Sequence, residues 1–201
     1  MLKEIVNYLT RFWNFVWHGE TLSSWIVCFV LAFVLIQYLL YPGLGLLLGS
    51  KYPVVAVVSE SMEHNSKFDD WFGGSCNGAP RSDAYKSLGF SKENFKQLLF
   101  KNGFDKGDLM ILYSAKSVSS GDVIVFMTNE RPDPIIHRVV SIFDDGKFYK
   151  TKGDNNCESI DFEKRIPKDR VIGKAVIRLP YLGWVKLAFV YLMQTFGYGR
   201  L

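Results

Sequence analysis

The distribution of hydrophobic positions divides the chain into an amino-terminal helical part and a longer part with the periodicity of strands. Residues 1–18 carry apolar side chains at helical spacing, with polar side chains on the opposite face. Phe12, Trp13 and Trp17 are of the aromatic types that settle at the headgroup level of a bilayer. We therefore predict that residues 1–20 form an amphipathic helix lying at a membrane interface.

A long apolar stretch follows this helix. No charged residue occurs between Glu20 and Lys51, and residues 23–41 alone supply about the 20 apolar positions that a membrane-spanning helix requires. Pro42 and Gly43 predict the end of that helix. A cleavable signal peptide has a shorter apolar core and a small-residue cleavage site, which is not found here. Residues 21–48 are therefore predicted to form an uncleaved membrane anchor.

Residues 49–184 are predicted to form a mainly β domain. Short apolar runs follow Gly-Asp pairs at residues 107–108 and 121–122, and Asp144, Asp145 and Gly146 give a hairpin signal. The predicted strands are residues 109–113, 123–127, 135–143, 147–151 and 171–179. Many short strands joined by such turns indicate an antiparallel, partly barrelled sheet.

The domain contains an insertion over residues 64–106, which we predict to be mostly helical. Ser91 can cap a helix over residues 91–100, with Glu93 favourable in its first turn and Gly103 after its end. The aromatic residues of the insertion argue against disorder. The last segment, residues 185–201, is apolar enough to lie in a membrane interface or to form a second span, and we favour the interfacial arrangement.

Charge and cysteine content narrow the function further. The net charge of +4 is too small and too scattered to indicate a nucleic-acid partner. Cys28 lies within the apolar stretch, so at most Cys76 and Cys157 could pair, and three free or partly paired thiols are the default expectation. No Cys-x-x-Cys spacing indicates zinc, and we expect neither a metal nor a cofactor.

Ser61 is the strongest candidate for chemistry. It follows a β-branched run at residues 54–58 and lies in a Ser-x-Ser-Met motif, which alone is more typical of a turn. Three further motifs follow in order: Gly-Asp-Val-Ile-Val-Phe at residues 121–126, Ile-His-Arg-Val-Val at 136–140, and Lys-Gly-Asp-Asn-Asn at 152–156. Together they make residues 54–184, apart from the insertion, resemble the type I signal peptidases, particularly the archaeal and endoplasmic-reticulum branch. His64 departs from that pattern, because a proline is usual there.

The resemblance implies a role for several residues. Ser61 matches the nucleophile, and Ser59 matches the serine whose hydroxyl supports the oxyanion beside the backbone N–H of Ser61. Met62 matches a methionine that packs at the membrane-facing edge of the site. His137 stands where bacterial members carry the lysine base, and an imidazole can accept a proton near neutral pH without the burial that a lysine needs.

Two aspartates could orient the imidazole of His137. The position of the working aspartate in the family points to Asp161, and we predict that Asp161 is the third catalytic residue. Asp154, in the Gly-Asp-Asn turn, is predicted to be a supporting residue that bonds to backbone. Asp154, Asn156 and Glu158 also alternate as in a calcium loop, but the glycine expected at the sixth position is absent.

The resemblance implies a membrane-anchored serine endopeptidase with a Ser-His-Asp arrangement, which cleaves signal peptides from exported preproteins. Its expected location is the cell membrane, or the endoplasmic-reticulum membrane in a eukaryote, with a single span and the catalytic domain on the extracytoplasmic side. Expected partners are preprotein substrates, the lipid bilayer and further subunits, without nucleic acid. The alternative is a catalytically decayed, membrane-tethered β domain that binds a partner through residues 64–106. A soluble repressor-type Ser-Lys autoprotease is disfavoured by the anchor and by His137.

Overall fold

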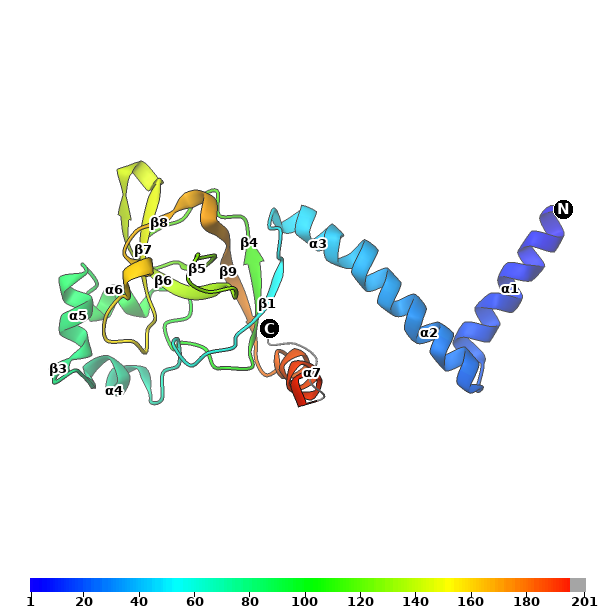
Figure 1. Cartoon of the computed structure of the whole chain (residues 1–201), viewed down its shortest axis with the longest axis horizontal. Helices are drawn as coiled ribbons and strands as arrows, with labels where there is room; N and C mark the ends of the chain where they lie inside the picture. Colours follow the sequence, from blue (N-terminus) through cyan, green and yellow to red (C-terminus); the bar gives the residue numbers. More distant parts are fainter. Residues whose placement is uncertain (196–201) are drawn as a thin grey trace. The chain divides into compact units, whose positions relative to one another are not determined.

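The computed structural model describes residues 1–195, without the side chains of residues 189, 193 and 194. It divides the chain into a helical unit, Met1–Leu47, and a β-rich unit, Leu48–Leu201 (Figure 1).

The helical unit contains α1 (Leu2–His18), α2 (Leu22–Leu35), the π-helical turn η1 (Ile36–Leu40) and the start of α3 (Tyr41–Leu48). Thr21 caps α2 by accepting a hydrogen bond from the N–H of Ser24. The break predicted at Pro42 is wrong, because the helix continues through it. Proline lacks an N–H and its ring crowds the carbonyl four residues earlier, and the wider η1 turn accommodates both effects. The result is a helix of 27 residues over Leu22–Leu48, which is long and apolar enough to cross a membrane.

The β-rich unit is built on a seven-stranded sheet with the order β1-β4-β9-β5-β6-β7-β8, in which all neighbours are antiparallel. Register shifts between β4 and β9, between β5 and β9 and between β6 and β7 help to curl it. The predicted antiparallel, partly barrelled fold is confirmed. The strands are β1 (Val54–Ala56), β4 (Leu109–Tyr113), β5 (Val123–Phe126), β6 (Ile135–Phe143), β7 (Phe148–Lys152), β8 (Ile166–Pro167) and β9 (Val171–Leu179).

The β6–β7 hairpin that the sequence predicts is present. Its turn, η2 (Asp144–Gly146), holds all three residues at positive φ, between 50° and 83°. Aspartate and glycine tolerate this left-handed backbone better than other residues. The hairpin matters for the site because β6 carries His137 and Arg138.

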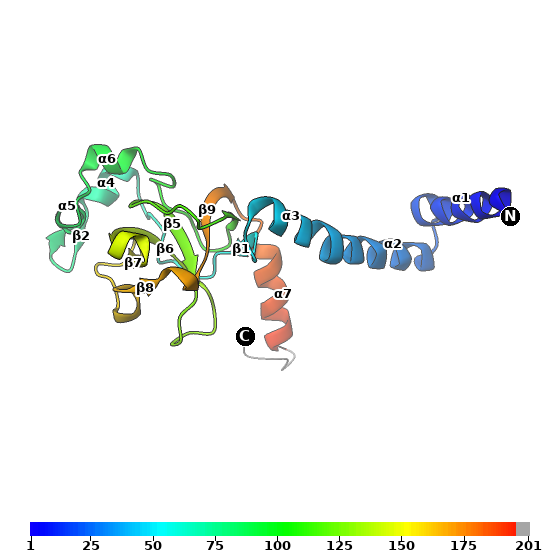
Figure 2. The same cartoon turned by 90° about the horizontal axis from the view of Figure 1, so that it is seen from above.

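The insertion is mostly helical and has its own core. Its elements are α4 (Phe68–Gly73), β2 (Ser75–Cys76), β3 (Ala79–Pro80), α5 (Arg81–Ser87) and α6 (Lys92–Lys96). Both views place α4, α5 and α6 together at one end of the β-rich unit (Figure 2). Trp71, Phe72, Tyr85 and Phe95 are buried together and pack against Val140 of β6. Ser91 caps α6 as predicted, although α6 is shorter than the predicted helix.

A disulfide between Cys76 of β2 and Cys157 ties the insertion to the segment that follows β7. Of the alternatives that the sequence left open, the structure shows the paired one, and the two Cα atoms lie 5.4 Å apart although 81 residues separate them in sequence. The number of residues between the two cysteines could not predict whether they pair. Cys28, in α2, is a free thiol.

The remaining elements are the short turns η3 (Asp161–Glu163) and η4 (Lys168–Arg170) and the helix α7 (Trp184–Thr195). Among the side chains of α7 that the structure describes, that of Leu187 is buried. With 12 residues, α7 falls short of the ~20 that a span requires. Residues 196–201 of the segment predicted to be interfacial or spanning lie outside the described residues.

Candidate active site

Ser61 is held at the end of a short segment that leaves β1. The N–H of Val57 donates to the carbonyl of Asp108 at 2.8 Å, and Val57 is buried. Met62 is fully buried on the other side of Ser61, and its carbonyl accepts from the N–H of Phe104. With both flanks anchored in the core, the Ser61 side chain is positioned while remaining partly exposed. The hydroxyl of Ser59 lies 3.1 Å from that of Ser61.

His137 is the third residue of β6, opposite Ile124 of β5, and is almost entirely buried. Its Nε2 is 2.8 Å from the Ser61 hydroxyl, within hydrogen-bond distance. The sequence therefore predicted correctly that these two residues come together, although 76 positions separate them. The distance is that expected between a nucleophile and its general base.

The carboxylate on the other side of the imidazole belongs to Glu163. Its Oε1 bonds to Nδ1 of His137 and also accepts from the Thr151 hydroxyl at 3.2 Å. Its Oε2 accepts from the backbone N–H of Ile160 at 3.0 Å, and the side chain is fully buried. A carboxylate at Nδ1 favours the tautomer that carries its proton there, which leaves Nε2 free to accept the proton of Ser61.

The placement predicted for Asp161 is therefore wrong. Its side chain is 96% exposed and pairs with Lys164 at 2.6 Å, an interaction that lowers the pKa of the Asp161 carboxyl. Asp161 and Glu163 are the first and last residues of the turn η3, which directs Glu163 inward and Asp161 to solvent. Glu163 was not predicted from the sequence, because the distance that the family places between the Gly-Asp-Asn motif and its working aspartate leads to Asp161. The available signal was a second carboxylate within the same turn.

Asp154 occupies the supporting position predicted for it, but its partners are side chains rather than turn backbone. It is fully buried and receives hydrogen bonds from Arg138 at 2.6 and 2.9 Å and from the Tyr85 hydroxyl at 2.8 Å. Burial alone would raise the pKa of the Asp154 carboxyl, but the charge and hydrogen bonds of Arg138, with the bond to His64, hold this pKa well below its usual range. Asp154 is thus an anion at neutral pH.

His64, where the sequence departs from the family pattern, joins the same group of residues. Its Nε2 lies 3.1 Å from Asp154 Oδ2, and its ring stacks on Trp71 with the ring centres 3.4 Å apart. Burial lowers the pKa of His64, against the opposing effect of Asp154. The replacement of proline by histidine thus links the segment after Ser61 to the aromatic core of the insertion.

Gly153 is the point of closest approach between the segment after β7 and the Ser61–His137 pair. A Cβ at this position would lie 2.8 Å from the Ser61 carbonyl oxygen and 2.9 Å from His137 Nε2, closer than real Cβ contacts allow. The N–H of Asn155 donates to the same carbonyl at 2.8 Å. Only glycine lets the segment pass this close, and the contact fixes the position of Ser61 relative to His137.

The described residues contain no group of three or more His, Cys, Asp or Glu side chains placed to hold a metal ion. What the geometry supplies is a connected hydroxyl, imidazole and carboxylate on Ser61, His137 and Glu163. Serine hydrolases that use a histidine base connect the same three kinds of group in this order.

Comparison with known proteins shows which proteins this chain is similar to in sequence. The chain is 29% identical over 160 residues to the signal peptidase complex catalytic subunit sec11 of Schizosaccharomyces pombe, covering 75% of this chain and 74% of that one. It is 30% identical over 119 residues to the subunit SEC11 of Plasmodium falciparum, covering 48% of this chain and 64% of the relative. It is 28% identical over 159 residues to the subunit SEC11C of Homo sapiens, covering 74% of this chain and 63% of the relative. No family model matches the chain.

These relatives confirm the resemblance to type I signal peptidases of the endoplasmic-reticulum branch, and the chain is a homologue of signal peptidase complex catalytic subunits. The match spans a little under two thirds of the Plasmodium and human relatives, at 64% and 63% of their lengths.

Proposed function

We propose that this chain is a membrane-anchored serine endopeptidase that removes amino-terminal signal peptides from exported preproteins. The observation that carries the proposal is the unbroken contact from the Ser61 hydroxyl through His137 to the buried carboxylate of Glu163. Homology to catalytic subunits of signal peptidase complexes supports the choice of substrate.

In the proposed reaction, the Ser61 oxygen attacks the scissile carbonyl while Nε2 of His137 takes its proton. Glu163 holds the imidazole in the required tautomer and stabilises the imidazolium that forms. The protonated His137 then gives its proton to the leaving amine, and the same base activates the water that hydrolyses the acyl-enzyme. The arrangement is thus Ser-His-Glu in place of the expected Ser-His-Asp.

Ser59 is proposed to stabilise the oxyanion together with the backbone N–H of Ser61. Its hydroxyl lies beside the nucleophile, at 3.1 Å. One such donor contributes about 3 to 4 kcal/mol to the stability of the transition state. Met62 is proposed to hold the segment of Ser61 against the core, because it is fully buried and its sulfur accepts from the N–H of Asp154 at 3.3 Å.

The proposed location is the endoplasmic-reticulum membrane, with the β-rich unit in the lumen and further subunits as partners. The helix over Leu22–Leu48 supports a single anchor. The Cys76–Cys157 disulfide supports an oxidising compartment for the β-rich unit, because disulfides rarely persist in the cytosol. Relatives named as subunits of a complex support the presence of partner subunits.

Cleavage of a preprotein by the purified, detergent-solubilised chain tests the proposal. Ser61→Ala and His137→Ala should each abolish cleavage while the thermal unfolding temperature stays close to that of the wild type. His137→Lys should not restore activity, because an ammonium base works near neutral pH only in a pocket that lowers its pKa. Cleavage that survives in Ser61→Ala would exclude Ser61 as nucleophile. A wild type that retains a stable fold but stays inactive both alone and in the membranes that contain its partner subunits would favour the alternative of a decayed, partner-binding domain.

A further inference from the structure

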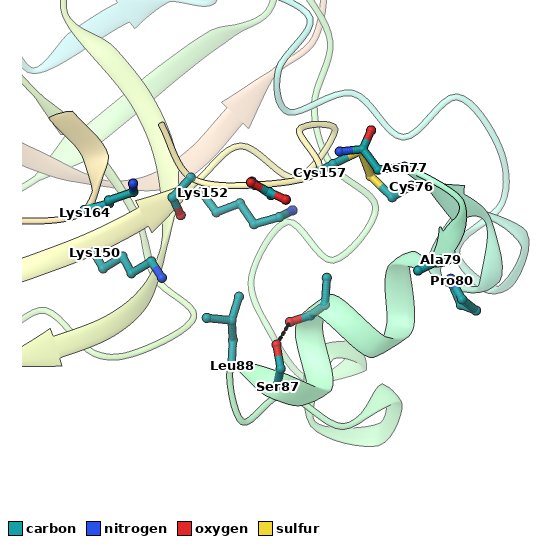
Figure 3. Close-up of a pocket in the computed structure, with 13 residues that line it drawn as sticks. Cys76, Asn77, Ala79, Pro80, Ser87, Leu88, Lys150, Lys152, Cys157 and Lys164 are labelled. Atoms are coloured by element: carbon teal, nitrogen blue, oxygen red, sulfur yellow. Dashed lines mark hydrogen bonds between the residues drawn. A yellow bond between two sulfur atoms is a disulfide. The ribbon is translucent and has the colours of Figure 1, made fainter. Parts of the chain in front are cut away.

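A pocket of about 510 Å³ lies between the insertion and the segment that follows β7. The Cys76–Cys157 disulfide lines it, Pro80 and Leu88 supply apolar walls, and β7 supplies Lys150 and Lys152. Figure 3 shows the side chains of Lys150 and Lys152 extending from β7 toward α5. The volume falls within the range of about 300 to 1,000 Å³ that is usual for ligand sites.

Lys152 is unusual because it is a buried cation with neutral partners. Lys152 is 1% exposed. Its ammonium donates to the Tyr85 hydroxyl at 3.3 Å and to the Gly153 carbonyl at 3.1 Å. Within residues 1–195, no carboxylate lies within ion-pair distance of it. Burial lowers the pKa of Lys152 to about 8, although Asp154 acts in the opposite direction. A buried ammonium with no carboxylate in direct contact is destabilising, and a bound anion would offset part of that cost.

The charges around the pocket favour an anion overall. Lys150 is half-buried and has no hydrogen bond or ion pair from its side chain in the described part of the chain. Lys164 also lines the pocket, but Asp161 already pairs with it. Glu158 is the acidic residue of the lining. Lys150 and Lys152 therefore remain as cations without a partner of opposite charge.

We propose that this pocket binds a carboxylate side chain of an acidic peptide segment, with the ammonium groups of Lys150 and Lys152 as its counter-ions. Charge-assisted bonds from two ammonium groups suit a carboxylate. The apolar walls formed by Pro80 and Leu88 suit the aliphatic stem of a glutamate and the residues beside it, whereas an inorganic anion would leave these walls without a partner. The lining of the pocket does not include Ser61, His137 or Glu163, so the proposal does not depend on the peptidase activity.

The test is a binding titration with the full chain in detergent, in a Ser61→Ala background so that the probe is not cut. The probe is the peptide Gly-Glu-Ser-Glu-Gly with a neutral fluorophore, and the matched peptide has glutamine at both glutamate positions. We expect the acidic peptide to bind at least tenfold more tightly. Lys150→Gln should weaken its binding by about five- to tenfold, which corresponds to roughly 1 to 1.4 kcal/mol.

Lys147→Gln is the control variant, because Lys147 lies on the same hairpin, is exposed and does not line the pocket. It changes the net charge by the same amount and should leave the affinity unchanged. Lys152→Met should weaken binding further, with its fold checked by thermal unfolding. Equal effects of Lys150→Gln and Lys147→Gln, or equal affinity for both peptides, would overturn the proposal. Displacement of the probe by inorganic phosphate at equal affinity would overturn a peptide as the ligand.

Discussion

Two buried carboxylates on the segment between β7 and β8 bond to two adjacent residues of β6 that differ in their chemistry. Asp154 bonds to Arg138, and Glu163 bonds to His137. A guanidinium stays charged at every physiological pH, so the Arg138–Asp154 pair is permanent and orders the fold. An imidazole can gain and lose a proton, so the His137–Glu163 pair can take part in a reaction. The residue of β6 that each carboxylate meets therefore distinguishes structural support from chemistry better than burial does.

The largest expected effect separates Glu163 from Asp161. Glu163→Gln keeps the shape of the side chain but can stabilise the wrong tautomer of His137. The corresponding change in a well-studied triad lowers turnover by about 10⁴-fold, so we expect a loss of two to four orders of magnitude in the cleavage rate. Asp161→Asn is the matched control and should change the rate by less than about twofold, since Asp161 is exposed and pairs with Lys164.

The readout is single-turnover cleavage of a preprotein, with thermal unfolding measured on the same samples. An active Glu163→Gln protein beside an inactive Asp161→Asn protein would reverse the assignment.

The two carboxylates and their partners also differ in how far the sequence could predict them. Ser61, His137 and the antiparallel strands were predictable, because motif order and two-residue periodicity are local features that survive divergence. The role of Glu163 was not predictable, and the Cys76–Cys157 bond was left only as a possibility. Both depend on how the segment after β7 folds back onto β6 and onto the insertion, and a spacing rule from a family without this insertion does not describe that path.

The next largest effect is expected at Asp154, in stability rather than chemistry. Asp154→Ala leaves Arg138 as a buried charge without its carboxylate, which typically costs about 3 to 5 kcal/mol. We expect the unfolding temperature of the β-rich unit to fall on the order of 10 °C. Cleavage should recover partly when assayed at lower temperature, where the variant is folded, whereas Glu163→Gln should show no recovery. A stable but inactive Asp154→Ala protein would give Asp154 a role in the reaction.

The disulfide should contribute a smaller amount to the stability of the segment that carries both carboxylates. Cys157 lies between Asp154 and Glu163, and its bond to Cys76 closes a long loop. Replacing both cysteines by serine should cost about 2 to 4 kcal/mol in urea unfolding. Cys28→Ser is the control and should leave the urea midpoint unchanged, since Cys28 is a free thiol. A double variant as stable as the wild type would show that the remaining hydrogen bonds suffice to hold the segment.

The smallest effect concerns His64, the histidine on the structural carboxylate. His64→Gln keeps a donor for Asp154 but loses the stacking on Trp71, which is worth about 0.5 to 1.5 kcal/mol. We expect that loss in unfolding free energy and no change in single-turnover cleavage, in contrast to His137→Gln, which should be inactive. An inactive but stable His64→Gln protein would make His64 part of the reaction and would contradict the division between the two carboxylates.

The pH dependence of the same variant sharpens the contrast, because burial lowers the pKa of His64 in the folded chain. Below the ordinary value of about 6.5, the unfolded chain then binds a proton more readily than the folded one, so His64 contributes less stability as pH falls from 7 to 5. The stability difference between wild type and His64→Gln should therefore shrink over this range in thermal unfolding at several pH values. A difference that grows on acidification would mean that Asp154 outweighs burial and that His64 is protonated in the fold.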